Sequence, residues 1–267
     1  MTRPSAELLQ LSKKDVQELS ALMAQADSVE LKLLVPHGER RSTLDALEAE
    51  LLDAELRHVY FCDTPELRLY QAGVIVRARD RPGDLVVKLR PVDPATLESS
   101  LRAAKRFRVE VDAMPRGYVC SASYRRSLAP EDLRSVVEGR RPVSDVLSPK
   151  QRSLLDDHSP ARVTPDDLTV LGPVHVMKLK ASPRELRQKY AVELWMFPDG
   201  SRILELSTRC KPESFFGIAA RAREFLSERG LPLDGEFQTK TGLAMGFFAR
   251  DEQPSGGSRI RPPRRGH

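Results

Sequence analysis

Basic side chains recur two residues apart in four segments that have the alternating pattern of β-strands. The pairs are Arg77 and Arg79, Lys88 and Arg90, Arg106 and Arg108, and Lys178 and Lys180. Successive side chains of a strand point to opposite faces, so each pair lies on one face of its strand. Apolar residues such as Phe107, Val109 and Val111 occupy the other face. The chain must therefore fold so that several charged strand faces lie either in water or around a shared interior.

Carboxylates are concentrated on particular strands and do not alternate with the basic residues, as cross-strand ion pairing would require. They include Glu30, Glu110, Asp112, Glu193 and Glu205. An amphipathic sheet with its charged face in water is the ordinary interpretation. The separation of the two signs favours a barrel interior instead. Lysine and arginine suit a polyanion, and grouped carboxylates suit Mg²⁺ or Mn²⁺.

Eight segments have strand character, with few helices between them. They span 28–35, 58–62, 74–79, 85–90, 106–112, 174–181, 191–197 and 202–208. This arrangement predicts an α+β fold, a closed or nearly closed antiparallel eight-stranded β-barrel with helices packed outside. A doubly wound fold would need regular strand–helix alternation and a glycine-rich phosphate loop, and neither is present.

The chain divides into three parts. Residues 1–27 are predicted to form an N-terminal helical extension, with an amphipathic helix over 5–26. Residues 28–250 form the barrel domain, in which 122–170 are a helical insertion whose short helices open at Pro130 and Pro149. Residues 251–267 are rich in Gly, Ser, Pro and Arg and are predicted to be a disordered basic tail.

Composition narrows the class of protein. Of the 267 residues, 40% are hydrophobic and 30% charged, which excludes a largely disordered chain. No segment reaches the roughly 18 apolar residues of a membrane span, and no secretory signal pattern opens the chain, so we expect a cytoplasmic protein without a membrane partner. The net charge is +5, which indicates little about nucleic acid, and such a partner is not expected. Nothing in the sequence indicates an oligomeric state.

An ordered set of motifs resembles the CYTH family, the triphosphate tunnel metalloenzymes, over roughly residues 28–248. Its members include inorganic tripolyphosphatases, thiamine triphosphatases and class IV adenylate cyclases. "VELK" at 29–32 is similar to the family's opening Glu-x-Glu-x-Lys strand, and "YFCDTPELRLYQAGVIVRARD" at 60–80 to its Tyr-Phe-Asp-Thr-Pro signature. "VVKLRP", "RVEVD", "ILELS" and "TKTGLA" follow in the family's order.

The resemblance implies roles for individual residues. The implied phosphate-binding residues are Lys32, Arg77, Arg79, Lys88, Arg90, Arg108, Lys178, Lys180 and Lys240, with the choice between Lys178 and Lys180 left open at the sixth strand. The implied metal ligands, for Mg²⁺ or Mn²⁺, are Glu30, Glu110, Glu193 and Glu205. The implied catalytic residues are Lys32, Glu30 and Glu205.

Two positions depart from the family pattern. Ser28 stands where the first glutamate of the opening strand belongs, and Ser207 replaces one of the paired glutamates of the last strand. Each lost carboxylate lowers the negative charge that holds a divalent cation. Hydrolysis with one metal remains open, whereas a two-metal mechanism is disfavoured.

We therefore expect metal-dependent hydrolysis of a triphosphate, with inorganic tripolyphosphate favoured because an interior built of charges recognises phosphates and little else. Two alternatives stay open. One is a class IV-type adenylate cyclase, which would have to position a purine. The other is a non-catalytic module that binds polyphosphate or a nucleotide, which the serines at 28 and 207 favour.

Overall fold

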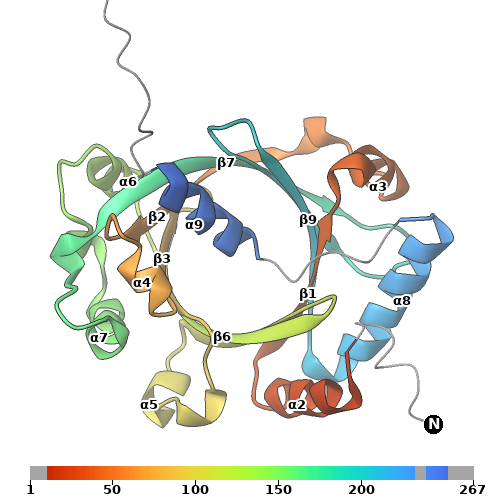
Figure 1. Cartoon of the computed structure of the whole chain (residues 1–267), viewed down its shortest axis with the longest axis horizontal. Helices are drawn as coiled ribbons and strands as arrows, with labels where there is room; N and C mark the ends of the chain where they lie inside the picture. The colour runs from red at the N-terminus through yellow and green to blue at the C-terminus, as the bar shows by residue number, and fades with distance from the viewer. Residues whose placement is uncertain (1–10, 232–238, 252–267) are drawn as a thin grey trace, which may run out of the picture.

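The computed structural model describes residues 11–231 and 239–251, and within them nine strands close into a barrel (Figure 1). The strands are β1 (Ser28–Val35), β2 (Glu55–Asp63), β3 (Val74–Arg79), β4 (Asp84–Leu89), β5 (Phe107–Met114), β6 (Gly117–Ser127), β7 (Thr169–Ala181), β8 (Tyr190–Met196) and β9 (Arg202–Cys210). Their order around the barrel is β1-β5-β6-β4-β3-β2-β7-β8-β9, with β9 returning to β1.

The predicted closed barrel in an α+β fold is confirmed, but two details of the prediction are wrong. The barrel has nine strands, and it is mixed because β1 pairs with β5 in parallel. The missed strand is β6, so residues 122–127 belong to the barrel wall and not to the helical insertion. The sequence of β6 has few large β-branched residues, and its inner face carries small and polar side chains, Ser121, Ser123 and Arg125, which gave no clear strand pattern.

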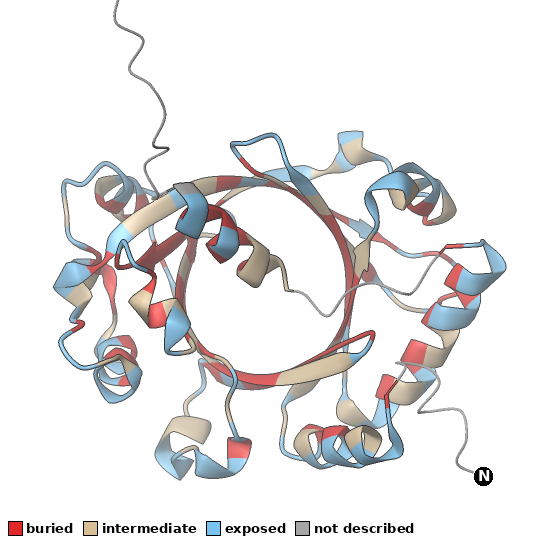
Figure 2. Ribbon diagram, viewed as in Figure 1, coloured by how far each residue is buried: buried red, intermediate tan, exposed pale blue. Residues whose placement is uncertain are grey.

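Helices surround the barrel on its outside, as expected. They are α2 (Lys13–Met23), α3 (Arg40–Ala46), α4 (Arg68–Gln71), α5 (Ser99–Arg102), α6 (Pro130–Val137), α7 (Pro149–His158) and α8 (Phe215–Glu228), whereas α9 (Lys240–Asp251) packs on inner faces of the strands. Figure 2 shows their outward faces exposed and the strands largely buried. No helix of the described residues is long and apolar enough to cross a membrane. Residues 5–10 of the predicted first helix, and the predicted tail from 252 onward, lie outside the described residues.

Two apolar clusters hold the fold together. The larger lies between the outer faces of the strands and the helices and includes Val29, Leu31 and Val109. The smaller joins α9 to the inner faces of β2, β7 and β8, and its members include Phe61, Val176, Trp195 and Phe248. Helix α9 lies across one opening of the barrel (Figure 1). Apolar side chains thus fill one part of the interior, and the charged residues occupy the rest.

The helical insertion is attached to the barrel by a buried amide. Ser148 caps α7 and Pro149 begins it, and Gln151 completes the capping box. The Gln151 side chain donates from Nε2 to the carbonyl oxygens of Leu85 in β4, at 2.9 Å, and Tyr124 in β6, at 3.3 Å. Because a buried amide needs partners, these bonds tie α7 to two strands of the wall.

The segment between β2 and β3 fixes the backbone of Arg90, one of the basic residues of the interior. The Asp63 carboxylate accepts the backbone N–H groups of Thr64, Leu69 and Tyr70, at 2.7 to 2.9 Å, as aspartate commonly does in turns. Gly73 follows with a φ of 78°, and a Cβ there would lie 2.7 Å from the carbonyl oxygen of Arg90. Only glycine allows this approach, which holds the end of β4 against the turn.

Candidate functional site

Five cationic side chains converge on one cavity inside the barrel. They are Lys32 from β1, Arg77 from β3, Lys88 from β4, Arg90 just after β4, and Lys240 from the first residue of α9. The described lining contains one carboxylate, Glu205 of β9, together with Ile75, Val86, Thr239 and Thr241. Strand alternation places these residues inward, since their sequence neighbours pack in the outer apolar cluster. The excess of positive charge on this lining would complement an anion with several negative charges.

Asp112 of β5 is the shared counter-ion of three of these cations. Its side chain is 0% exposed, and its oxygens lie 2.8 Å from Lys32 Nζ, 2.6 Å from Arg90 Nη2 and 3.5 Å from Lys88 Nζ. Burial alone would raise the pKa of Asp112, but the three cations, Lys32 first, hold it far below its usual range. Asp112 is therefore ionised, and it fixes three cations at the cavity wall.

Lys240 has a separate pair of counter-ions. Its ammonium group contacts the carboxylates of Glu193 and Glu205, the second at 2.6 Å. Glu193 also accepts from Lys178 Nζ at 2.6 Å and from Trp195 Nε1 at 3.2 Å. Burial opposes the charge on Glu193, but Lys240 and Lys178 outweigh it and lower its pKa. The pKa of Glu205 is raised, because burial and the charge of Glu193 outweigh the effect of Lys240.

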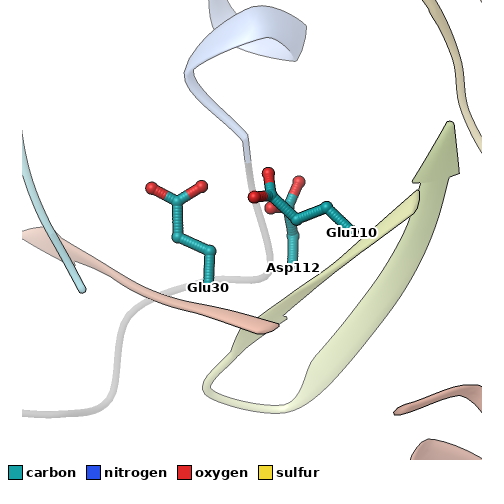
Figure 3. Close-up of side chains that lie close together, drawn as sticks. All are labelled: Glu30, Glu110 and Asp112. Atoms are coloured by element: carbon teal, nitrogen blue, oxygen red, sulfur yellow. The ribbon is translucent and has the colours of Figure 1, made fainter. Parts of the chain in front are cut away.

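Three carboxylates form an acidic cluster beside this cavity. One oxygen from each of Glu30, Glu110 and Asp112 lies within 4.8 Å of the others, and Figure 3 shows the three side chains reaching toward a common space from β1 and β5. The parallel register pairs Glu30 with Asp112 directly. Hard carboxylate oxygens are the ligands that Mg²⁺ and Mn²⁺ prefer, so this donor set fits such an ion. We call these three residues the acidic triad.

The acidic triad is already in contact with cations of the chain. Lys32 Nζ is 3.3 Å from Glu30 Oε2, and Arg209 of β9 lies 2.5 Å from Glu110 Oε2 and 3.4 Å from Glu30 Oε2. Burial would raise the pKa of Glu30, but Lys32 and Arg209 bring it down to about 2. The pKa of Glu110 is raised by burial and by the charges of Glu30 and Asp112. Ser28 donates from Oγ to Glu110 Oε2 at 3.3 Å.

A further group of charges lies along β3, β4 and β6. Arg79 binds Asp84 with two hydrogen bonds, at 2.8 Å from Nε and 2.5 Å from Nη2, and Arg125 lies 3.3 Å from the same carboxylate. Arg77 has no carboxylate at salt-bridge distance within the described chain, and its buried Nε has no hydrogen-bond partner. Burial and the charge of Arg79 lower the pKa of Arg77 to about 10. Arg77 thus offers its donors to the cavity.

The structure brings some of the predicted site residues together and separates others. Lys32, Arg77, Lys88, Arg90, Lys240 and Glu205 share the cavity. The four predicted metal ligands fall into two groups, Glu30 and Glu110 in the acidic triad, and Glu193 and Glu205 around Lys240. Arg79 is held by Asp84 and Lys178 by Glu193. Arg108 is exposed and donates to the carbonyl oxygen of Phe107, and Lys180 is exposed.

Four residues of this charged interior were not assigned a role from the sequence, namely Asp84, Asp112, Arg125 and Arg209. Asp112 and Arg209 continue the two-residue alternation of Glu110 and Ser207, so the pattern on their own strands was the available signal. Asp84 is the first residue of β4 and lies one residue before the predicted strand segment 85–90. Arg125 lies in β6, the strand that was not predicted.

No protein-family model and no curated protein matches the sequence. Among solved structures, the chain is similar to HpAC1 from Hippeastrum, a candidate adenylyl cyclase that has a dominant triphosphatase activity, with 18% identity and a TM-score of 0.57 over 82% of this chain and 95% of that one. It is also similar to a candidate adenylate cyclase from Bacillus halodurans, with 13% identity and a TM-score of 0.56 over 80% and 94%. The resemblance to CYTH-like proteins is thereby confirmed for the fold.

Proposed function

We propose that this protein hydrolyses a phosphoanhydride bond of a triphosphate inside the barrel, with inorganic tripolyphosphate as the favoured substrate and Mg²⁺ or Mn²⁺ as the metal. The observation that carries the proposal is the convergence of five cations on one cavity whose described lining has one carboxylate, directly beside the acidic triad. The dominant triphosphatase activity of HpAC1, which has the same fold, supports the same reaction class.

The cationic residues would bind the phosphate chain and stabilise the charge that develops on it. Arg77 and Arg90 present guanidinium groups that match phosphate oxygens, and Lys32, Lys88 and Lys240 add point charges. The wall is preorganised, because Asp112 holds Lys32, Lys88 and Arg90 before any substrate is present. Preorganised charges in a site with little water contribute much of the catalysis of phosphoryl transfer.

Glu30, Glu110 and Asp112 would hold the metal ion, which neutralises phosphate charge and activates water when it is bound. Glu205 lies on the cavity wall with a raised pKa, so it is placed to bind or release a proton there. Hydrolysis of tripolyphosphate consumes one water and yields phosphate and diphosphate.

Trp195, the single tryptophan of the sequence, offers no free face on which the base of a nucleotide could stack. Trp195 is 2% exposed, hydrogen-bonds Glu193 and lies under Lys240, whose Nζ is 5.4 Å from its ring centre. Its aromatic face is thus occupied by the protein. This observation favours inorganic tripolyphosphate over a cyclase reaction, in which a purine has to be positioned.

Retention of binding without catalysis is the second candidate function. Ser28 and Ser207 lower the negative charge of the interior, and every member of the acidic triad already contacts a cation of the chain. Under this alternative the protein would hold polyphosphate without cleaving it.

The test measures phosphate release from tripolyphosphate, ATP and thiamine triphosphate with Mg²⁺ or Mn²⁺, and tripolyphosphate binding by calorimetry in parallel. The Glu205→Gln variant is the active-site change, and Glu185→Gln, on the surface, is its matched control. We expect metal-dependent release that is lost in Glu205→Gln and kept in Glu185→Gln. Binding without release would favour the non-catalytic alternative, and absence of both would contradict the proposed function.

A further inference from the structure

Arg209 bridges two of the three carboxylates of the acidic triad. It lies opposite Glu30 in the antiparallel register of β9 and β1, and its Nη2 contacts both Glu110 Oε2 and Glu30 Oε2. The bridge joins β9 to β5 across β1. The Arg209 guanidinium group therefore contacts the same carboxylate oxygens that would bind a divalent ion.

A guanidinium group and a metal ion cannot share these oxygens. A divalent cation binds carboxylate oxygens at roughly 2.0–2.6 Å, which would place it beside the positive charge of Arg209. Like charges at such a distance repel strongly where little water screens them. The metal would bind only after the Arg209 side chain has moved away from Glu110.

The Arg209 side chain is free to make this movement. It is 56% exposed, whereas Lys32, the other cation at Glu30, is 11% exposed and held by Asp112. Long exposed side chains change rotamer readily, so Arg209 is able to turn into solvent, and a bound metal ion would then neutralise Glu110 in its place.

The serines at positions 28 and 207 explain why the Arg209 side chain alone is enough to bridge Glu30 and Glu110. Ser207 precedes Arg209 by two residues on the same face of β9, and Ser28 donates to Glu110. Neither adds a negative charge, so Glu30 and Glu110 remain as a pair that one guanidinium group can bridge. A further carboxylate beside the acidic triad, at position 28 or 207, would favour a doubly charged ion over a singly charged side chain.

We propose that Arg209 is a built-in competitor of the divalent metal ion, which occupies Glu30 and Glu110 until the metal displaces it. Arg209 thereby sets the metal concentration at which the acidic triad is loaded. The inference rests on the metal site of the proposed function, but it does not depend on hydrolysis.

The test measures Mn²⁺ binding to the phosphate-free protein, from the electron paramagnetic resonance signal of free Mn²⁺. We expect Arg209→Gln to bind Mn²⁺ roughly tenfold more tightly than the wild type, because a repelling charge is removed. Arg209→Lys keeps the charge and is expected to stay near the wild type. In the Arg209→Gln background, Glu110→Gln is expected to abolish the gain.

Arg125→Gln is the matched control. Arg125 is also a barrel arginine with a 56% exposed side chain, but it pairs with Asp84 and does not contact the acidic triad. Its loss removes the same charge, and we expect the Mn²⁺ affinity to change less than about twofold. An equal gain in Mn²⁺ affinity in Arg125→Gln would mean that the effect comes from the overall positive charge of the barrel, and it would overturn the inference.

Unchanged or weaker Mn²⁺ binding in folded Arg209→Gln would also overturn it, as would an absence of Mn²⁺ binding in every variant. Circular dichroism and thermal unfolding establish that each variant is folded. A tighter Mn²⁺ site in Arg209→Gln together with no phosphate release would uphold the competition and contradict only the hydrolysis.

Discussion

Lys32 Nζ lies 2.8 Å from Asp112 Oδ1 across β1 and β5, the parallel strand pair of the barrel. Lys32 is one of the five cations that line the cavity, and Asp112 is a member of the acidic triad, so this contact joins the two parts of the site. Lys32 is nearly buried, and although burial opposes its charge, Asp112 and Glu30 raise its pKa. The pair is therefore ionised over the physiological pH range.

Asp112→Asn is expected to lower stability and to raise affinity for tripolyphosphate. The change removes the counter-ion that Lys32, Lys88 and Arg90 share, and of the three only Lys32 keeps a carboxylate, Glu30, at salt-bridge distance within the described chain; the loss costs about 3 kcal/mol of unfolding free energy for a buried pair. The cations that lose this partner should bind tripolyphosphate roughly tenfold more tightly in the absence of metal. Urea unfolding and calorimetry with EDTA measure the two effects, with exposed Asp156→Asn as the control. A fall in tripolyphosphate affinity together with the fall in stability would contradict the prediction and would mean that Asp112 mainly orients the cations.

Arg77→Met is expected to have the opposite pair of effects. Arg77 is half-buried in the barrel, its buried Nε has no hydrogen-bond partner, and no carboxylate of the described chain lies at salt-bridge distance, so replacing it by an apolar side chain should stabilise the free protein by about 1 kcal/mol. Tripolyphosphate affinity should fall at least about tenfold, since a charge-assisted contact is lost. Thermal unfolding and calorimetry measure both. Lower stability in Arg77→Met would show that Arg77 has a structural role.

Arg79→Met is the matched control for that variant. Arg79 and Arg77 lie on the same face of β3, but Asp84 holds Arg79 with two hydrogen bonds. Its removal takes two charge-assisted hydrogen bonds from the buried Asp84 carboxylate and leaves it with Arg125 at 3.3 Å, which we expect to cost about 3 kcal/mol. The two neighbouring arginines should therefore change stability in opposite directions.

The pH dependence of stability should report Lys88. Burial, with the charges of Lys32 and Arg90, lowers the pKa of Lys88 to about 8, against about 10.4 in an unfolded chain. Between these values the unfolded state binds more protons than the folded state, so the free energy of unfolding contributed by Lys88 rises with pH. Urea unfolding from pH 7 to 10 should show this rise in the wild type relative to Lys88→Met. Parallel pH curves for the two proteins would contradict the shift.

Lys178 and Lys180 should differ in their contribution to binding. Lys178 is bound to Glu193 beside Lys240, whereas Lys180 is exposed. Lys178→Ala is expected to weaken tripolyphosphate binding roughly tenfold, as for a charge-assisted contact, and Lys180→Ala by less than about twofold, as for an exposed charge. Calorimetry on both variants decides which of these two lysines of β7 contributes to tripolyphosphate binding. Equal losses would assign both lysines to the phosphate path.

The sequence alone determined the class of fold and which charged side chains share a strand face. Alternation along Arg77–Arg79, Lys88–Arg90 and Glu110–Asp112 indicated which side chains share a strand face, because the backbone geometry of a strand imposes a period of two. Eight strand segments with few helices between them predicted a closed or nearly closed barrel, which the structure and its likeness to HpAC1 confirm for the fold. Local geometry was sufficient for these conclusions.

The tertiary structure alone decided which charges meet. The parallel pairing of β1 with β5 brings Glu30 to Asp112, and the closing pair β9–β1 brings Arg209 to Glu30, although these residues are distant in the sequence. Strand period says nothing about which strands are neighbours or in what register. Coulomb energy depends on the distance between specific atoms, so the partner of each ion is a property of the closed barrel and not of any single strand.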